Sequence, residues 1–203
     1  MKSTDWNGNT KSVFSTLGAS THSAKDRDKM DYYATDLNAF RYLVEDGGVR
    51  LSPTVLEPCA GGGHLSEQIK QYGYEVVSKD VVQRDYPLDG VWDFLEQDEK
   101  WDGDIVLNPP YSQAKQFIEK CLSMIRNGDK VYAFLKLTFL ESKVRRPLFD
   151  TKQLKTVYVS SSRLGCVKNG RFDDKEFKSS AVCYCWYEFV KGWDRDPVIR
   201  WIN

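Results

Sequence analysis

Residues 54–72 read TVLEPCAGGGHLSEQIKQY, and this stretch decides the fold. Its first four residues form an apolar, strand-like run, its middle is rich in glycine, and residues 64–72 have the character of a helix. Glycine lets the backbone turn tightly enough for a ligand to lie against it. The stretch therefore predicts a strand, a glycine turn and a helix in succession.

The same alternation of strand and helix continues along the chain. Strand-like runs occur at 75–78, 104–107, 130–137, 154–160 and 181–190, with a short one near 91–92, and helical spacing of apolar residues occurs at 37–44 and 113–125. This alternation is typical of α/β proteins with a mainly parallel sheet and helices on both faces. Ligands of such sheets bind beyond the carboxyl ends of the strands. We therefore expect residues 58–63 and 108–111, which directly follow strands, to lie at the binding edge.

Length and composition suit one compact domain, because 41% of the 203 residues are hydrophobic. Residues 1–31 are polar with few apolar anchors, so we expect a flexible amino-terminal arm there and a single domain over 32–203. The net charge is zero, but residues 142–178 contain ten Lys or Arg and four Asp or Glu. This local positive excess predicts either a nucleic-acid footprint or a solvated basic face.

The cysteines and histidines indicate no metal site. The five cysteines are scattered without a Cys-x-x-Cys pair, and His22 and His64 have no ligand partner at a suitable spacing. The sequence contains neither a run of about 18 apolar residues nor an apolar amino-terminal leader. We therefore expect a cytoplasmic protein without a metal and without a membrane partner.

The glycine turn indicates a cofactor that carries adenosine. A glycine-rich turn alone also fits nucleotide-binding folds in general. Asp80, however, ends the next strand at roughly the spacing at which a carboxylate accepts hydrogen bonds from ribose hydroxyls. The turn lacks the Lys-Ser or Lys-Thr pair of a phosphate-binding loop. A sulfonium cofactor bearing adenosine therefore fits better than a nucleoside triphosphate.

The second decisive stretch is residues 104–111, DIVLNPPY. Two prolines after Asn108 fix the backbone and remove two N–H donors, which leaves carbonyl groups as acceptors on a rigid loop. The side-chain oxygen of Asn108 and the carbonyl of Pro109 could both accept from a planar amine, and Tyr111 offers a face on which a base can stack. This loop predicts a site that holds a planar amine.

EPCAGGG and NPPY, in this order and about 45 residues apart, resemble the amino-methyltransferase class of DNA methyltransferases, especially small phage-type adenine-N6 enzymes. Further stretches share this resemblance, namely DYYATD at 31–36, Asp93-Phe94, FLKLTFLE at 134–141, SSSR at 160–163 and DPVIRWIN at 196–203. The resemblance implies a Rossmann-like class I fold with a seven-stranded, mainly parallel sheet whose last strand is antiparallel. It also implies a phage or prophage origin in a bacterial host.

The resemblance further implies S-adenosyl-L-methionine as cofactor and in-line methyl transfer to N6 of an adenine flipped out of double-stranded DNA. The catalytic loop would be Asn108, Pro109, Pro110 and Tyr111. The cofactor would contact Tyr33, Thr35, Glu57, Pro58, Cys59, Ala60, Gly61, Gly63, Asp80, Asp93, Phe94 and Asn108.

The chain has no room for the separate target-recognition domain of larger relatives. DNA contacts are therefore expected from basic and aromatic residues of the later loops: Lys143, Arg145, Arg146, Arg163, Lys168, Arg171 and Phe172. A homodimer or an accessory subunit could also supply sequence recognition. Other planar amines remain open as targets, namely cytosine N4, RNA bases or a protein glutamine. A non-catalytic DNA- or partner-binding module that retains the fold is a further alternative.

Overall fold

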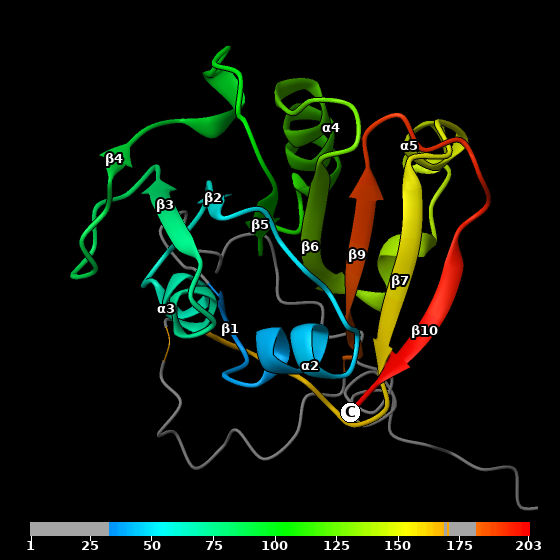
Figure 1. Cartoon of the computed structure of the whole chain (residues 1–203), viewed down its shortest axis with the longest axis horizontal. Helices are drawn as coiled ribbons and strands as arrows, with labels where there is room; N and C mark the ends of the chain where they lie inside the picture. Colours follow the sequence, from blue (N-terminus) through cyan, green and yellow to red (C-terminus); the bar gives the residue numbers. More distant parts are fainter. Residues whose placement is uncertain (1–32, 169, 171–181) are drawn as a thin grey trace, which may run out of the picture. The chain divides into compact units, whose positions relative to one another are not determined.

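The computed structural model describes residues 33–168, 170 and 182–203 (Figure 1). The expected arm at 1–31 lies outside these residues, and so do parts of the later basic loop. No helix of the described residues is long and apolar enough to span a membrane.

The centre of the fold is an eight-stranded sheet with the order β10-β7-β9-β6-β5-β2-β3-β4. Its strands are β2 (Thr54–Glu57), β3 (Glu75–Asp80), β4 (Gly90–Val91), β5 (Ile105–Leu107), β6 (Lys130–Lys136), β7 (Leu154–Ser160), β9 (Tyr184–Val190) and β10 (Val198–Ile202). Only β9 among them runs antiparallel to its neighbours, and Figure 1 shows its arrow opposed to those of β7 and β10.

The expected fold class is confirmed. The last strand that the sequence predicts, over 181–190, is the antiparallel β9. An eighth strand, β10, pairs in parallel with β7 at the edge of the sheet. The sheet therefore has one strand more than the seven that the resemblance implies. Residues 196–203 are not predicted as a strand, and β10 lies within this stretch.

Helices cover both faces of the sheet. One face carries α2 (Ala39–Glu45) and α3 (His64–Gln71), and the other carries α4 (Ala114–Met124), α5 (Arg146–Asp150) and the 3₁₀ helices η1 (Phe94–Glu96) and η2 (Leu137–Leu140). Successive residues of a strand point to opposite faces, so Val106 of β5 packs with α2 and α3 while Ile105 and Leu107 pack with α4. The two hydrophobic clusters therefore lie on either side of one sheet.

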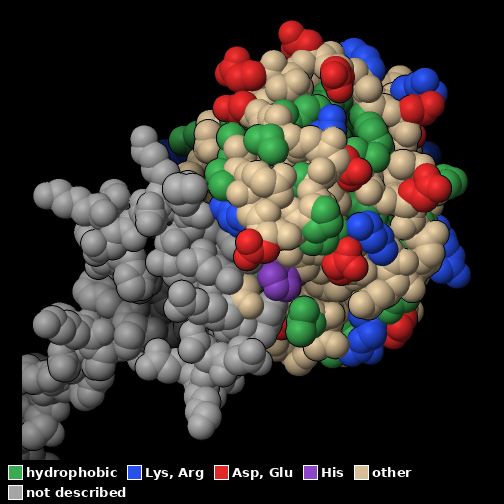
Figure 2. Space-filling model, turned by 90° about the vertical axis from the view of Figure 1, so that its left-hand side faces the viewer, with side chains coloured by type: hydrophobic (Ala, Val, Ile, Leu, Met, Phe, Trp, Pro, Cys, Tyr) green, Lys and Arg blue, Asp and Glu red, His purple; other side chains and the backbone are tan. Residues whose placement is uncertain are grey.

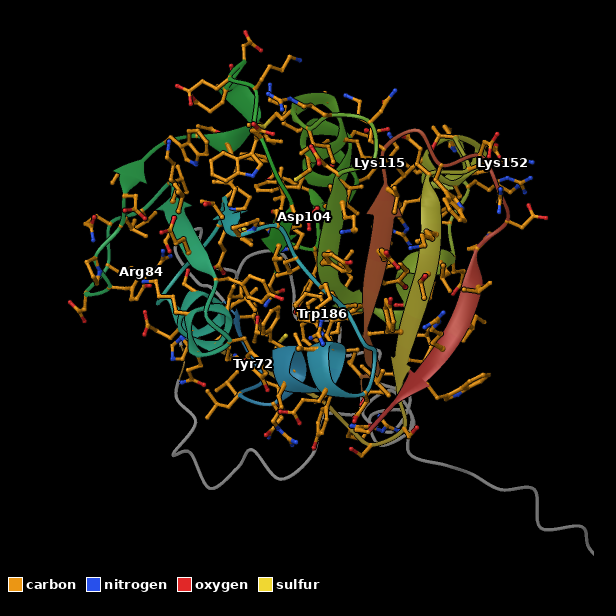
Figure 3. The ribbon with its side chains drawn as sticks, viewed as in Figure 1. Tyr72, Arg84, Asp104, Lys115, Lys152 and Trp186 are labelled. Atoms are coloured by element: carbon orange, nitrogen blue, oxygen red, sulfur yellow. The ribbon has the colours of Figure 1, made fainter. Side chains whose placement is uncertain are left out.

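Buried polar contacts fix two of these elements on the sheet. The indole nitrogen of Trp186 in β9 donates to the carbonyl of Ala39 at 2.9 Å and so ties α2 to the sheet (Figure 3). The Asp104 carboxylate accepts from the backbone N–H groups of Ser52 at 2.9 Å and Lys130 at 2.8 Å. Asp104 thus joins the amino-terminal ends of β2, β5 and β6, away from the predicted site.

A second, two-stranded sheet forms outside the main one. Its strands are β1 (Tyr33–Thr35) and β8 (Cys166–Lys168), which pair antiparallel with Thr35 opposite Cys166. Three-residue strands carry too little pattern to be predicted from sequence, and their pairing joins segments more than 130 residues apart. This small sheet lies beside the loop that follows β5.

Candidate active site

The two loops that the sequence singles out leave the sheet side by side. β2 and β5 are parallel neighbours that pair at Leu56 and Ile105, so the turn 58–63 and the loop 108–111 emerge at the same edge. The Cys59 thiol interacts with the backbone of Asn108, and burial raises the pKa of this thiol well above its usual value. Cys59 is therefore a neutral packing group between the two loops.

The glycine turn is held by the end of β3. Ala60 donates its N–H to the Lys79 carbonyl at 2.9 Å, and Gly61 donates its N–H to Asp80 Oδ2 at 2.8 Å. Gly63, the N-cap of α3, has φ 77°, and a Cβ built on it would lie 2.1 Å from the ring of Tyr86. Glycine is therefore required at position 63 both for its conformation and for the close approach of Tyr86.

Asp80 is 7% exposed, and both of its carboxylate oxygens already accept hydrogen bonds. Besides Gly61, it accepts from the N–H of Val82 at 2.9 Å and from Arg84 Nη1 at 3.2 Å. The carboxylate thus shapes the turn, and its contact with a ribose stays a prediction. Arg84 was not predicted as a site residue, because its position four residues after Asp80 is the only indication that the sequence gives. Its side chain is labelled in Figure 3.

Glu57 is a second acid buried beneath the glycine turn. It is 1% exposed and accepts a short hydrogen bond from the Ser66 hydroxyl, whose oxygen lies 2.6 Å from that of Ser78. Burial raises the pKa of Glu57 to about 7, against the opposing effect of the Ser66 hydrogen bond. A positive charge brought to this turn would therefore favour the ionised form of Glu57.

The Asn108 side chain has a defined orientation. Its Nδ2 donates to the carbonyl of Tyr33 at 2.8 Å and to Thr35 Oγ1 at 3.1 Å. A backbone carbonyl can only accept, so the nitrogen must face β1 and Oδ1 must face away from it. No donor among the described residues bonds Asn108 Oδ1 or the carbonyl of Pro109, so the loop presents two neighbouring free acceptors.

Each predicted proline has a distinct environment. Pro109 is buried, whereas Pro110 is exposed and its carbonyl accepts from the N–H of Gln113 at the start of α4. The Pro110 carbonyl is thus used by the helix, and the Pro109 carbonyl is the acceptor that remains.

Tyr111 lies among aromatic and cationic side chains. Its ring centroid is 6.1 Å from that of Tyr33 and 6.0 Å from that of Tyr184, and Lys136 Nζ lies 4.9 Å from its centre. Burial raises the pKa of the Tyr111 phenol well above its usual value, so the hydroxyl stays protonated. A cavity of about 70 Å³ adjoins this ring and is lined by Tyr111, Ala114, Leu135, Lys136, Thr138, Phe139 and Arg145.

Lys136 is a site residue that the sequence analysis missed. It is the last residue of β6, at the same carboxyl edge as the loops after β2 and β5. The signal was available, because Lys136 is a cation near the carboxyl end of the largely apolar predicted strand 130–137 and is expected to leave the core at this edge.

Asp93 and Phe94 occupy different environments from each other. The exposed Asp93 caps η1 by accepting from the N–H of Leu95 at 3.1 Å. Phe94 is 2% exposed and packs against Trp92 and Phe117, with ring centroids 5.9 and 5.2 Å away. Their contact with a cofactor stays a prediction, and Phe94 has a clear structural role in the core.

Three predicted DNA-contacting residues are exposed, namely Lys143, Arg146 and Arg163. Arg146 is paired with Asp150 on its own helix at 2.6 Å, and its side chain is 75% exposed. Lys168 ends β8, and its side chain is not described. Arg171 and Phe172 lie outside the described residues.

Arg145 has a structural role in the basic stretch. Its guanidinium donates to the carbonyls of Phe139 at 2.7 Å, Thr138 at 3.1 Å and Glu141. These bonds bind the 3₁₀ helix η2 to the start of α5. Arg145 therefore supports the loop that carries its exposed neighbours, and its contact with phosphate stays a prediction.

The side of the domain that carries β3, β4 and α3 shows acidic, basic and apolar side chains interspersed (Figure 2). This view shows no broad basic surface to which a nucleic acid could bind. Among the described residues no three His, Cys, Asp or Glu side chains gather as metal ligands would.

Neither a protein-family model nor a curated protein matches the sequence. Solved structures match at low identity. A protein from Lactococcus lactis described as a hemolysin has a TM-score of 0.56 at 10% identity, over 80% of this chain and 91% of its own. A type I restriction-modification methyltransferase subunit from Streptococcus thermophilus has a TM-score of 0.52 at 12% identity, over 78% of this chain and 46% of its own.

A protein from Listeria monocytogenes described as a class I S-adenosylmethionine-dependent methyltransferase is also similar, with a TM-score of 0.50 at 11% identity, over 81% of this chain and 62% of its own. The mostly parallel sheet with one antiparallel strand is accordingly the Rossmann-like fold of class I methyltransferases. At such low identities this likeness concerns the fold, and the chemistry has to be argued from the residues of the site.

Proposed function

We propose that this protein transfers a methyl group from S-adenosyl-L-methionine to the exocyclic N6 amine of an adenine in double-stranded DNA. The observation that carries the proposal is the pair of free acceptors on the loop after β5. Tyr33 and Thr35 hold the Asn108 nitrogen, which leaves Asn108 Oδ1 and the carbonyl of the next residue, Pro109, as the acceptors of this loop.

The residues of the glycine turn suit a cationic adenosine cofactor. Two buried carboxylates, Glu57 and Asp80, lie against the turn, and they would repel the phosphates of a nucleotide. S-adenosyl-L-methionine supplies a methyl group activated by its sulfonium charge. The residues that would hold it are Glu57, Asp80 and the backbone of 58–63, with Tyr33 and Thr35 of β1 at the methionine side.

The loop 108–111 would position and polarise the amine. An amine that donates both hydrogens to Asn108 Oδ1 and the Pro109 carbonyl gains electron density on nitrogen, which strengthens its attack on the methyl carbon. The amine nitrogen would form a bond to the methyl carbon as the C–S bond breaks with its electron pair returning to sulfur, and the alkylated nitrogen would then release one proton to solvent. A strongly basic side chain is not required, which agrees with a Tyr111 hydroxyl that stays protonated.

DNA is the favoured substrate class for two reasons. The exposed Lys143, Arg146 and Arg163 belong to the basic stretch 142–178, which suits a phosphate backbone. A structural neighbour that is described as the methyltransferase subunit of a type I restriction-modification system supports the same choice. A base must leave the duplex to reach the loop, and the ring of Tyr111 would stack on it.

The substrate class can be tested with tritium-labelled cofactor. The purified full chain is incubated in separate arms with duplex DNA, with RNA of the same sequence and with a denatured bacterial protein extract. We expect label in DNA, and none in DNA with Asn108→Ala. Label in RNA or protein but not in DNA would overturn the substrate, and retardation of DNA in a gel without any label would favour a non-catalytic module.

A further inference from the structure

A second cavity lies away from the loops after β2 and β5. Its volume is about 470 Å³, within the usual range for sites that bind small organic molecules. It opens between the segment 47–50 after α2 and the amino-terminal halves of β6, β7 and β10, where β9 ends. In Figure 1 this segment runs from α2 across the front of the domain toward β2.

Four cations line this cavity. Lys130 pairs with Asp104 at 3.4 Å, and Lys155 pairs with Glu188 at 2.9 Å. Arg50 and Arg200 have no carboxylate partner among the residues that the structure describes. The lining therefore carries an uncompensated positive charge.

The single acid of the lining is already satisfied. Glu188 is 2% exposed and accepts from Lys155 Nζ at 2.9 Å, from the Tyr158 hydroxyl at 3.1 Å and from the Tyr132 hydroxyl at 3.5 Å. Its oxygens thus leave little capacity to accept a hydrogen bond from a bound molecule.

Trp193 is half-buried and lines the cavity. Its indole Nε1 is buried and has no hydrogen-bond partner among the described residues, so this nitrogen does not face the opening of the cavity. The exposed guanidinium groups of Arg50 and Arg200 are therefore the charged donors that a bound molecule can reach.

We propose that this cavity is a second ligand site, separate from the methyl-transfer site, which binds a phosphate monoester joined to a planar group, as in a nucleoside monophosphate. Arg50 and Arg200 would bind the phosphate, since guanidinium groups match phosphate oxygens in geometry and charge. The half-buried ring of Trp193 would contact the planar part, since the rings of Tyr132 and Tyr158 are buried in the core. The proposal does not depend on the methylation reaction.

The test uses uridine monophosphate, whose base differs from the adenine of the cofactor. Its affinity for the full chain is measured by calorimetry with saturating S-adenosylhomocysteine present, so that the methyl-transfer site is filled. We expect binding that persists under these conditions and weakens about tenfold or more in Arg200→Gln and in Arg50→Gln, since each variant loses a charged hydrogen bond. Both arginines are exposed, so the two variants should keep the melting temperature of the wild type.

Arg126→Gln is the matched control, because this exposed arginine pairs with Asp102 and does not line the cavity. It should bind as the wild type does. Trp193→Ala should weaken binding, because it removes the ring that would contact the planar part of the ligand. Absence of binding at millimolar ligand, loss of binding when S-adenosylhomocysteine is added, or equal affinity in all four variants would each overturn the proposal.

Discussion

The side-chain nitrogen of Asn108 donates to the main-chain carbonyl of Tyr33 at 2.8 Å, across 75 residues of sequence. This bond joins the loop after β5 to the small sheet of β1 and β8. It also determines which end of the Asn108 amide faces outward, because the carbonyl cannot donate. The first strand of the domain therefore acts on the proposed chemistry by orienting a side chain.

Thr35 should affect turnover through this orientation. Replacing it by valine keeps the shape of a buried side chain but removes one of the two oxygen acceptors of Asn108 Nδ2. We expect kcat to fall by roughly tenfold, the equivalent of one hydrogen bond, with KM for DNA nearly unchanged. Thr35→Ser, which retains the hydroxyl, should keep most of the activity. Equal kcat in the valine variant and the wild type would show that Tyr33 alone orients the amide.

Gly63→Ala should destabilise the fold more than Gly73→Ala. Both glycines have positive φ, 77° and 83°, but a Cβ at Gly63 meets the Tyr86 ring whereas a Cβ at Gly73 meets nothing within 4 Å. Gly73→Ala should cost about 1 kcal/mol from backbone strain alone, and Gly63→Ala clearly more. Urea unfolding monitored by circular dichroism gives both values. Similar losses for the two variants would mean that Tyr86 moves aside freely.

Stability should decrease with rising pH because of Glu57. The pKa of this carboxyl is raised by burial from 4.5 to about 7 in the folded chain, so the folded state binds a proton more tightly than the unfolded state. This contribution is fully present below about pH 4.5, decreases as the pH rises to about 7 and is absent above it. Glu57→Gln should flatten this part of the profile of unfolding free energy against pH. An unchanged slope in the variant would assign the pH dependence to other groups.

Arg145 and Arg146 should behave differently although they are adjacent. Arg145→Gln removes donors to three backbone carbonyls, so we expect a lower melting temperature. Arg146→Gln should leave the melting temperature unchanged, because its side chain is 75% exposed, but should weaken DNA binding and reduce the salt dependence of the affinity. Fluorescence anisotropy with labelled duplex at several salt concentrations measures the second effect. If Arg146→Gln keeps the salt dependence of DNA affinity that the wild type shows, Arg146 does not contact the DNA.

The strand, turn and helix at 54–72 could be predicted because each part has a strong local signal, and the structure reproduces it as β2, the glycine turn and α3. The pairing of β1 with β8 could not, since it depends on partners distant in sequence. The structural role of Arg145 could not be predicted for a similar reason: a run of basic residues predicts a solvated surface, and hydrogen bonds to backbone carbonyls give no signal in the sequence.

The central claim concerns which atom receives the methyl group. Duplex DNA is incubated with the full chain and cofactor that carries a trideuteromethyl group, digested to nucleosides and analysed by mass spectrometry, with Asn108→Ala as the control. We expect trideuterated N6-methyldeoxyadenosine with the wild type and none with the variant, although the variant still binds S-adenosylhomocysteine. Label only on N4 of deoxycytidine, or equal label from the variant, would contradict it.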